Sequence, residues 1–247
     1  MLTRSFSCLV LVVAVLASAS AAQAVVLTAI GSGNAALQAN GMTKIDILDP
    51  ENDGIIDTTK WGAGPISLDA NASGLWNTSG GETWAKVFDN GVSSAGFGGS
   101  TSKVCCGFSN PSGVQLVSAT DTYSITGYTI FSSNDSPDRD PSGWLLEGSN
   151  DGINFTTIDT VASHVFADSF DADAFDRLEG YEATFAPSAY YSTFRFRFLT
   201  TQGSQFAVQE IELFGNAFVP VPAPEPSTAL LMTLGLVGIS SIRRRRR

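Results

Sequence analysis

The chain has 247 residues, of which 43% are hydrophobic, 10% aromatic and only 15% charged. This composition is typical of a folded protein with a sizeable core and excludes an intrinsically disordered chain. The formal net charge is −10; without Arg4, the last five arginines and Glu225, which we expect processing to remove, 8 basic and 23 acidic side chains remain, a net charge of −15. Such an acidic surface repels phosphate backbones and argues against nucleic-acid binding, whereas it suits an exported protein or one that holds divalent cations.

Residues 1–24 have the three parts of a secretory signal peptide. Arg4 supplies the positive charge, residues 8–17 form the apolar segment, and Ala22-Gln23-Ala24 is a small-residue cleavage site. We expect cleavage after Ala24. The alternative is a membrane anchor, for which the apolar run is too short.

Residues 25–65 carry a weaker signal, and we expect them to form an extra strand, a lid or a spacer. The run from Asp49 to Gly54 resembles the start of a calcium-binding loop. Counted from Asp49, however, the twelfth position is Lys60 where a bidentate Glu is needed, and the third is Glu51 in place of Asp or Asn. We therefore interpret this run as an acidic surface turn.

From residue 66 onward, short apolar runs alternate with turn formers, which predicts an all-β architecture. Strands are expected at 113–118 and 123–131, the second placing Ile125, Tyr128 and Ile130 in the core. Cys105 and Cys106 are the only cysteines left after signal removal. They could form a strained ring or bond to another molecule, and their spacing fits no zinc or redox site.

The stretch 132–155 predicts a loop, a strand that starts at Trp144, a tight turn at 148–152 and a second strand near Phe155. The passage 160–180 contains His164, the only histidine, and several carboxylates. We interpret it as a solvated acidic loop, with ligand contact as the alternative, because loops on a rigid scaffold often carry function.

The clearest strand lies within 190–200, where Phe194, Phe196 and Phe198 alternate with Arg195 and Arg197. The period of two predicts a core face and an opposite face. The arginines either line a binding surface or, more simply, face solvent. A last strand is expected at 206–215.

Several of these runs resemble discoidin-like domains, the coagulation-factor C-type, galactose-binding-like family that includes many carbohydrate-binding modules. The resemblance is carried by RDPSGWLLEGSNDGINFTTID at 139–159, by YYSTFRFRFLT at 190–200 and by the last strand. It implies a jelly-roll β-sandwich over residues 66–216, with Arg139, Asp140 and Trp144 as framework. Asp140 would bond neighbouring backbone. In the alternative, a sugar stacks on Trp144 while Arg139 bonds its hydroxyls. The set of candidate ligand-binding residues is Arg139, Trp144, His164, Arg195 and Arg197.

The same resemblance implies a structural Ca²⁺ site that joins an early loop to the last strand. The matching positions are Lys86, Asp89, Gly91 and Ser94 in the loop, and Gln209 and Glu210 in the strand. Glu212 lies on the same strand face as Glu210 and is the substitute carboxylate. Gly91 offers only its carbonyl, and Phe97 stands where the family has a Trp. Oxygen ligands of this kind suit a hard cation; the alternative is a plain turn, because Asp-Asn-Gly is common in turns.

The C-terminal region has a proline-rich linker at 217–227, followed by an apolar segment and five arginines at 228–247. Together with the tripeptide Pro224-Glu225-Pro226, this layout resembles the PEP-CTERM sorting tail of Gram-negative bacteria. It implies a hydrophobic sorting helix, transient inner-membrane association, and processing by an exosortase that leaves the protein at the cell surface or in the extracellular matrix. The alternative is a permanent single-span anchor.

These features predict an exported, non-catalytic module that binds carbohydrate, with extracellular polysaccharide as the partner after passage through the secretion machinery. A structural matrix protein without a small ligand is the alternative from another class. A carbohydrate-active enzyme is a third, although the sequence has no nucleophile elbow, HExxH motif or phosphate-binding loop.

Overall fold

The computed structural model describes residues 25–41, 44–51, 53, 55–62, 66–68, 82–92, 103–107, 112–134, 136–166 and 177–220. Along the chain the elements are β1 (Thr28–Ser32), α1 (Gly33–Gly41), α2 (Thr58–Trp61), β2 (Ile66–Leu68), the 3-10 helix η2 (Trp84–Phe88), β3 (Val104–Cys106), β4 (Ser112–Val117), β5 (Tyr123–Phe131), the 3-10 helix η3 (Pro137–Arg139), β6 (Pro141–Ser149), β7 (Thr156–Val161), β8 (Glu179–Thr184), β9 (Thr193–Thr201), β10 (Phe206–Val208) and β11 (Glu210–Ala217).

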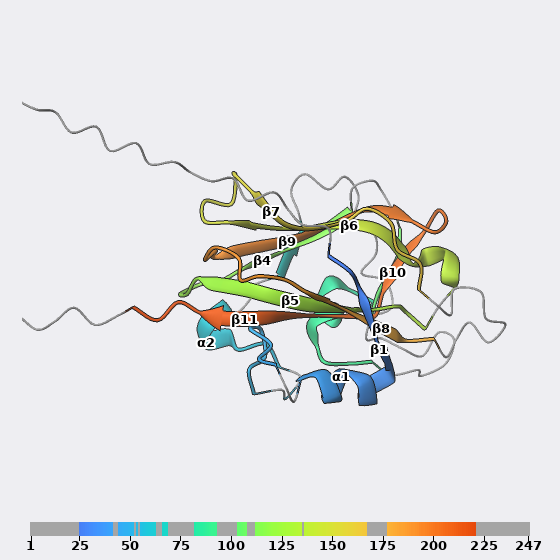
Figure 1. The fold of residues 1–247 in the computed structure, drawn as a ribbon, viewed down its shortest axis with the longest axis horizontal. Coiled ribbons are helices and arrows are strands. Elements are labelled where there is room, and N and C mark those ends of the chain that lie inside the picture. Colours follow the sequence, from blue (N-terminus) through green and yellow to red (C-terminus); the bar gives the residue numbers. More distant parts are fainter. Residues whose placement is uncertain are drawn as a thin grey trace, which may run out of the picture.

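Two antiparallel sheets face each other (Figure 1). One has the strand order β1-β8-β5-β11 and the other the order β2-β4-β9-β6-β7, while β10 pairs with β3 beside them. The predicted all-β sandwich is therefore confirmed. The predicted tight turn is confirmed too: β6 and β7 pair as a hairpin, and Gly152 in its turn has a φ of 68°, a conformation that favours glycine.

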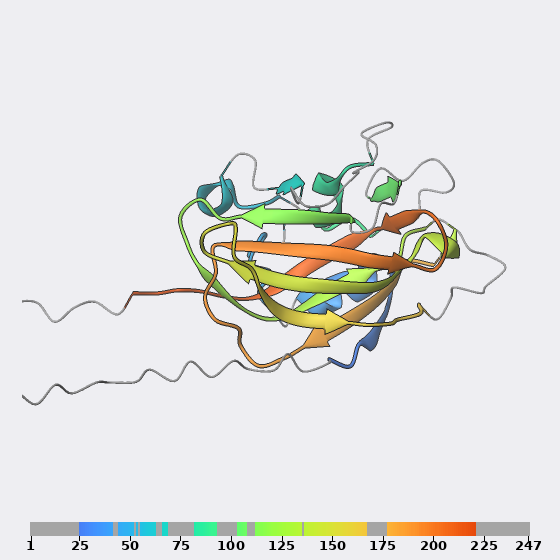
Figure 2. The ribbon, with the colours of Figure 1, turned by 90° about the horizontal axis from the view of Figure 1, so that it is seen from above.

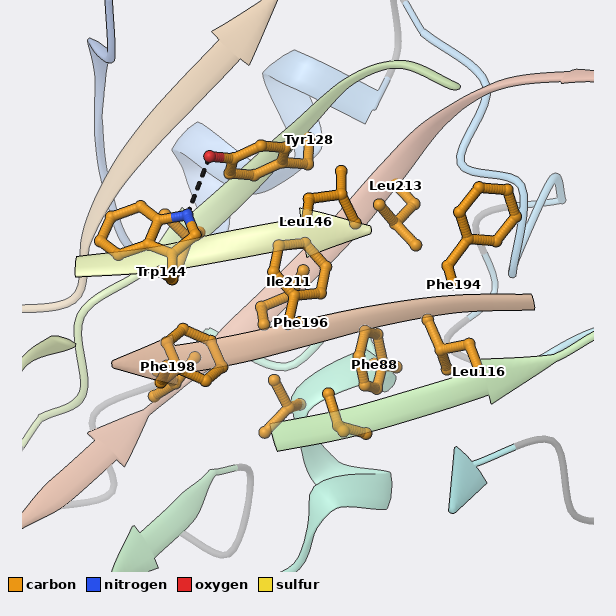
Figure 3. Close-up of a cluster of buried hydrophobic side chains, with 14 of the residues drawn as sticks. Phe88, Leu116, Tyr128, Trp144, Leu146, Phe194, Phe196, Phe198, Ile211 and Leu213 are labelled. Carbon is orange, nitrogen blue, oxygen red and sulfur yellow. Dashed lines mark hydrogen bonds between the residues drawn. The ribbon is translucent and has the colours of Figure 1, made fainter. Parts of the chain in front are cut away.

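The core fills the space between the two sheets (Figure 3). Phe194, Phe196 and Phe198 of β9 point inward and are 0% exposed, as the alternation predicts. They meet Ile211 and Leu213 of β11 in one buried cluster. Burying one such large apolar side chain contributes about 1.5–3 kcal/mol, so the alternating strands supply much of the driving force for folding.

The N-terminal segment extends one sheet and covers part of its outer face. β1 forms an edge strand by pairing with β8. α1 then packs Leu37 against Phe131 of β5. Residues 44–48 run along the free edge of β11, where Asp46 pairs with Phe214 and the backbone N–H of Ile47 donates to the carbonyl of Leu213 at 2.8 Å. β11 is buried from Glu210 to Gly215.

The connections at the two ends of the sandwich differ (Figures 1 and 2). At one end lie the loop after η2, the β5–β6 and β9–β10 connections and the start of β11, which the pairing of Glu210 with Phe131 brings together. We call this the long-loop end; its described loop residues are 89–92, 132–134, 136–140, 162–166, 177–178 and 202–209. The β4–β5, β6–β7 and β8–β9 connections lie at the other end, where β11 stops and the described chain leaves at 218–220; this is the tail end.

The predicted signal peptide and the predicted sorting helix lie outside the described residues. Among the residues that are described, no helix is long and apolar enough to cross a membrane.

Candidate functional site

The loop after η2 and the start of β11 meet at the long-loop end. η2 is held in place by buried Trp84, Val87 and Phe88, and the chain then turns at Asn90, whose φ is 54°. The backbone N–H groups of Asn90 and Gly91 each donate to the Glu210 carboxylate, at 3.3 Å. Two segments about 120 residues apart in sequence are thus joined where the resemblance predicts.

Gln209 adds a further contact between these segments, because its Nε2 donates to the Gly91 carbonyl at 3.0 Å. Lys86 lies in the same loop, with its Nζ 3.3 Å from Asp89 Oδ2. The structure therefore brings together five of the six predicted calcium residues. Ser94, the sixth, lies outside the described residues.

The electrostatics of this junction are unfavourable for free carboxylates. Glu210 is 0% exposed, and burial raises its pKa well above the usual value, as do the nearby charges of Asp89 and Glu212. The pKa of Asp89 is also raised by burial. Asp89 Oδ1 is buried and, within the described part of the chain, accepts no hydrogen bond. A cation would relieve these costs.

The donor set fits a hard cation, since it consists of carboxylates and backbone carbonyls from one turn and one strand. Side chains alone would not form this site. Among the described residues, the one place where three side-chain ligand atoms of His, Cys, Asp or Glu lie within 4.8 Å of one another is Glu82, Cys105 and Cys106. Those two cysteines are bonded to each other as a disulfide and are not thiolate ligands. The calcium site stays a prediction.

Two further carboxylates, which the sequence did not assign to this region, lie beside it. Asp49 is 2% exposed and its Oδ2 accepts from Asn90 Nδ2 at 2.6 Å, so the interpretation of its run as a surface turn is wrong at this residue. Asp46 is 8% exposed, and burial raises its pKa to about 7, with a smaller effect of the Asp49 charge. Nothing in the local sequence shows where this segment docks.

Glu212, the predicted substitute ligand, belongs to the same group. Its Oε2 accepts from Thr129 Oγ1 at 3.0 Å, whereas its Oε1 is buried and has no hydrogen-bond partner in the described chain. Burial raises the pKa of Glu212 to about 8, and the charges of Asp46 and Asp49 add to the effect. The outer face of β11 therefore concentrates buried carboxyl groups that are costly to ionise.

Trp144 belongs to the framework. Its ring is 0% exposed, and its Nε1 donates to Tyr128 Oη at 2.8 Å (Figure 3). The alternative of a sugar stacking on Trp144 is wrong, because no face of the ring reaches solvent.

Asp140 is framework through a contact that the sequence did not indicate. It is 0% exposed, and its Oδ2 accepts from the Arg177 guanidinium, which is itself 1% exposed. A buried ion pair thus joins the β5–β6 connection to the segment before β8. The carbonyl of Asp140 also accepts from the Gln202 N–H at 2.9 Å, which adds the β9–β10 connection.

Arg139, by contrast, is half-buried at the long-loop end. Its Nη1 lies 3.6 Å from the sulfur atoms of both Cys105 and Cys106. The neighbouring turn at Gly203 is close: a Cβ placed on Gly203 would lie 2.8 Å from the Cβ of Asp138. Of the five predicted ligand-binding residues, Arg139 is therefore the one with exposed polar loop residues, at 202–205, close by.

The two other arginines among the candidates lie elsewhere. Arg195 and Arg197 project from the outer face of the five-stranded sheet, where Arg195 Nε is 2.6 Å and Arg197 Nη1 3.9 Å from Glu147 Oε2. Arg195 also lies over the Phe155 ring at 3.6 Å. Arg195 is 7% and Glu147 6% exposed, so the simpler interpretation, that the arginines face solvent, is wrong at Arg195, whereas Arg197 is half-buried.

His164 packs edge-on against the ring of Tyr181, at 4.3 Å between ring centroids. Burial lowers its pKa to about 4, so the imidazole is neutral at physiological pH. Much of the acidic passage that follows, 167–176, lies outside the described residues.

Comparison with known proteins identifies the tail first. The model of the PEP-CTERM protein-sorting motif matches residues 222–247, so the chain carries this motif. Among curated proteins, an 81-residue stretch is 37% identical to a peptide-N(4)-(N-acetyl-β-glucosaminyl)asparagine amidase of Arabidopsis thaliana. That match covers 32% of this chain and only 10% of the relative's length.

Solved structures resemble the sandwich. The tandem CBM32-1 and CBM32-2 domains of Clostridium perfringens ZmpB match with a TM-score of 0.51 and 11% identity, over 81% of this chain and 43% of that one. CpGH89CBM32-5 of the same organism, in complex with GalNAc-β-1,3-galactose, has a TM-score of 0.44 and 16% identity, over 63% and 99%. The family 32 carbohydrate-binding module of Streptococcus pneumoniae EndoD has a TM-score of 0.43 and 9% identity, over 64% and 99%. The ZmpB match shows that the chain shares the fold of discoidin-like modules.

Proposed function

We propose that this chain is an exported, non-catalytic protein that binds carbohydrate at its long-loop end. The observation that supports this most is one combination: a sorting motif at 222–247 follows a sandwich with the fold of carbohydrate-binding modules. Because one fold hosts many functions, the fold alone does not choose the ligand. Extracellular polysaccharide is the ligand class that suits an exported protein of this kind.

Arg139 is the described residue that we assign to ligand contact. A guanidinium donates up to five hydrogen bonds in a fixed plane, which suits the adjacent hydroxyls of a sugar ring. The exposed turn at 202–205 and the disulfide beside Arg139 form the surface around its guanidinium group. Carbohydrate sites combine such a surface with a few polar groups.

Glycan binding tests this proposal. The chain without its signal peptide, residues 25–247 in mild detergent, should bind one or more polysaccharides on an array, and Arg139→Ala should weaken that binding about tenfold or more, the loss expected for a charged hydrogen-bonding group. Arg197→Ala, on the outer sheet face, is the matched control and should bind within about twofold of the wild type. Binding to no glycan would favour the structural-protein alternative. Turnover of a polysaccharide would favour an enzyme.

Calcium is proposed as a structural partner at the junction of Asp89 and Glu210. Its coordination by these carboxylates and by the carbonyls of the loop would supply the missing positive charge and fix the loop to β11. Its effect on stability is treated in the Discussion.

The tail is proposed to act before the mature protein reaches its destination. The apolar segment would hold the chain transiently at the inner membrane, and an exosortase would cut near Pro224-Glu225-Pro226. The intact mass of the protein recovered from the surface or matrix should then lack the apolar segment and the arginines. A recovered mass that still includes Arg247 would instead support the permanent anchor.

A further inference from the structure

Asp159 is a buried carboxylate on β7, the edge strand of the five-stranded sheet. It is 0% exposed. Its Oδ2 accepts from Tyr128 Oη at 2.7 Å, and its Oδ1 accepts from the Thr160 backbone N–H at 2.7 Å. Tyr128 in turn accepts from Trp144 Nε1, the bond drawn in Figure 3. The carboxylate is therefore an integral part of the core, and its charge affects the stability of the whole sandwich.

A third donor to Asp159 comes from the N-terminal segment. The backbone N–H of Val25, the first described residue, lies close enough to the carboxylate to lower its pKa. The Val25 side chain packs on the main hydrophobic core. Residues 25–27 also line a cleft of about 630 Å³ together with residues 160–164. Independent contacts thus place Val25 beside the end of β7.

The charge of Asp159 has no cation to balance it in the described chain, because its contacts there are the three donors above and none is charged. Burial raises the pKa of this carboxyl group, which reflects the cost of keeping it ionised. Buried carboxylates are usually paired with a positive group.

The sequence predicts cleavage of the bond between Ala24 and Val25. Hydrolysis adds the hydroxyl of water to the Ala24 carbonyl and a hydrogen to the Val25 nitrogen, and the new α-amino group takes up a proton because its ordinary pKa is about 7.7–8.0. We propose that the α-ammonium group of Val25, created by removal of the signal peptide, forms a buried ion pair with Asp159 and so fixes the N-terminal segment to the core. The proposal rests on the predicted cleavage site and is independent of carbohydrate binding.

The ion pair would act on more than the first residues. β1 is an edge strand with one partner, β8, and it leads directly into α1. In α1, Asn34 Oδ1 accepts from the Val92 backbone N–H at 2.8 Å, next to the loop that contacts Glu210. The precursor has a neutral amide at Val25 in place of the ammonium. Removal of the signal peptide during export would therefore increase the stability of the sandwich.

The experiment compares two N-termini in two backgrounds. The chain without its signal peptide, residues 25–247 in mild detergent, is prepared with Val25 as its first residue or with one additional Gly before it, which displaces the charge. The added Gly should lower the melting temperature on the order of 5–10 °C in the wild type, and by about 1 °C or less in Asp159→Asn. An equal effect of the Gly in both backgrounds, or no effect in the wild type, would overturn the proposal.

A second measurement does not depend on the folding of the Asp159 variant. The rate at which an amine-specific acylating reagent modifies Val25, followed against pH, gives the pKa of the α-amino group. We expect it at least one unit above the ordinary 7.7–8.0 in the folded chain and back in that range in urea. Val25→Ala keeps the amine and should give the same raised pKa. An ordinary pKa in the folded wild type would overturn the proposal as well.

Discussion

Removal of calcium at neutral pH is expected to lower the melting temperature of the mature chain by about 5–10 °C, the effect of a ligand present at roughly a hundred times its Kd. The physical reason is the cost of ionising the buried carboxyl groups of β11, because Glu210 and Glu212 are 0% and 1% exposed and burial raises the pKa of both; calcium would stabilise their ionised form. Thermal unfolding followed by circular dichroism, with calcium and with EDTA, measures the effect.

The fall in melting temperature on calcium removal should be larger at higher pH. The folded-state pKa values of Asp46 and Glu212 are raised from 3.8 to about 7 and from 4.5 to about 8, so between these values the folded chain binds more protons than the unfolded chain. The free energy of unfolding in EDTA therefore falls as the pH rises from about 4 to 8, by a few kcal/mol in order of magnitude. Calcium should flatten this decline because it offsets the neighbouring charge of Glu210.

Glu210→Gln separates this explanation from a general salt effect. The variant should lose its response to calcium and, in EDTA at pH 8, melt at a higher temperature than the wild type, because a buried charge is gone. Glu147→Gln, which removes the partner of Arg195 on the opposite sheet, should keep the full response to calcium. A Glu210→Gln chain that still responds to calcium as the wild type does would rule out this site.

The second large effect is expected at the ion pair between Asp140 and Arg177. Asp140→Ala should lower the free energy of unfolding by about 3–5 kcal/mol, because it leaves a guanidinium that is 1% exposed without its carboxylate. Urea denaturation at equilibrium measures the change. Asp138→Ala, two residues earlier and exposed, is the matched control and should change stability by less than about 0.5 kcal/mol. A loss below 1 kcal/mol at Asp140 would mean that the pair contributes little net stability.

The fold was predictable because its signal is local. The alternation of Phe194, Phe196 and Phe198 identifies a strand and its inward face without reference to the rest of the chain, and the glycine turn at 148–152 identifies a hairpin. The meeting of the η2 loop with Glu210 has no such signature. It followed from resemblance to a family, and no periodicity in the sequence indicates it.

What could not be predicted depends on long-range packing. Asp49 looked like part of a surface turn, and it is buried because its segment pairs with the edge of β11 and meets Asn90 of the loop after η2. Arg177 lies in an acidic passage that looked solvated, yet it pairs with Asp140 deep in the structure. Trp144 was correctly assigned to a core strand, although that strand begins at Pro141 and not at Trp144, and only the packed sandwich shows that its ring is inaccessible. Local sequence determines which residues form strands; it does not report which polar groups the assembled sheets enclose.

The separation of the two ends of the sandwich has a consequence for avidity. The chain leaves from the tail end, whereas the proposed ligand contacts are at the long-loop end. A chain tethered through its tail would hold its loops outward, and neighbouring chains on one surface would present them in the same direction. A repeating polymer that engages several such chains gains affinity from the high effective concentration of the next site, without any new contact. Weak individual binding would then be enough for firm attachment, and release of the tail would convert the same molecule into a weak monovalent binder.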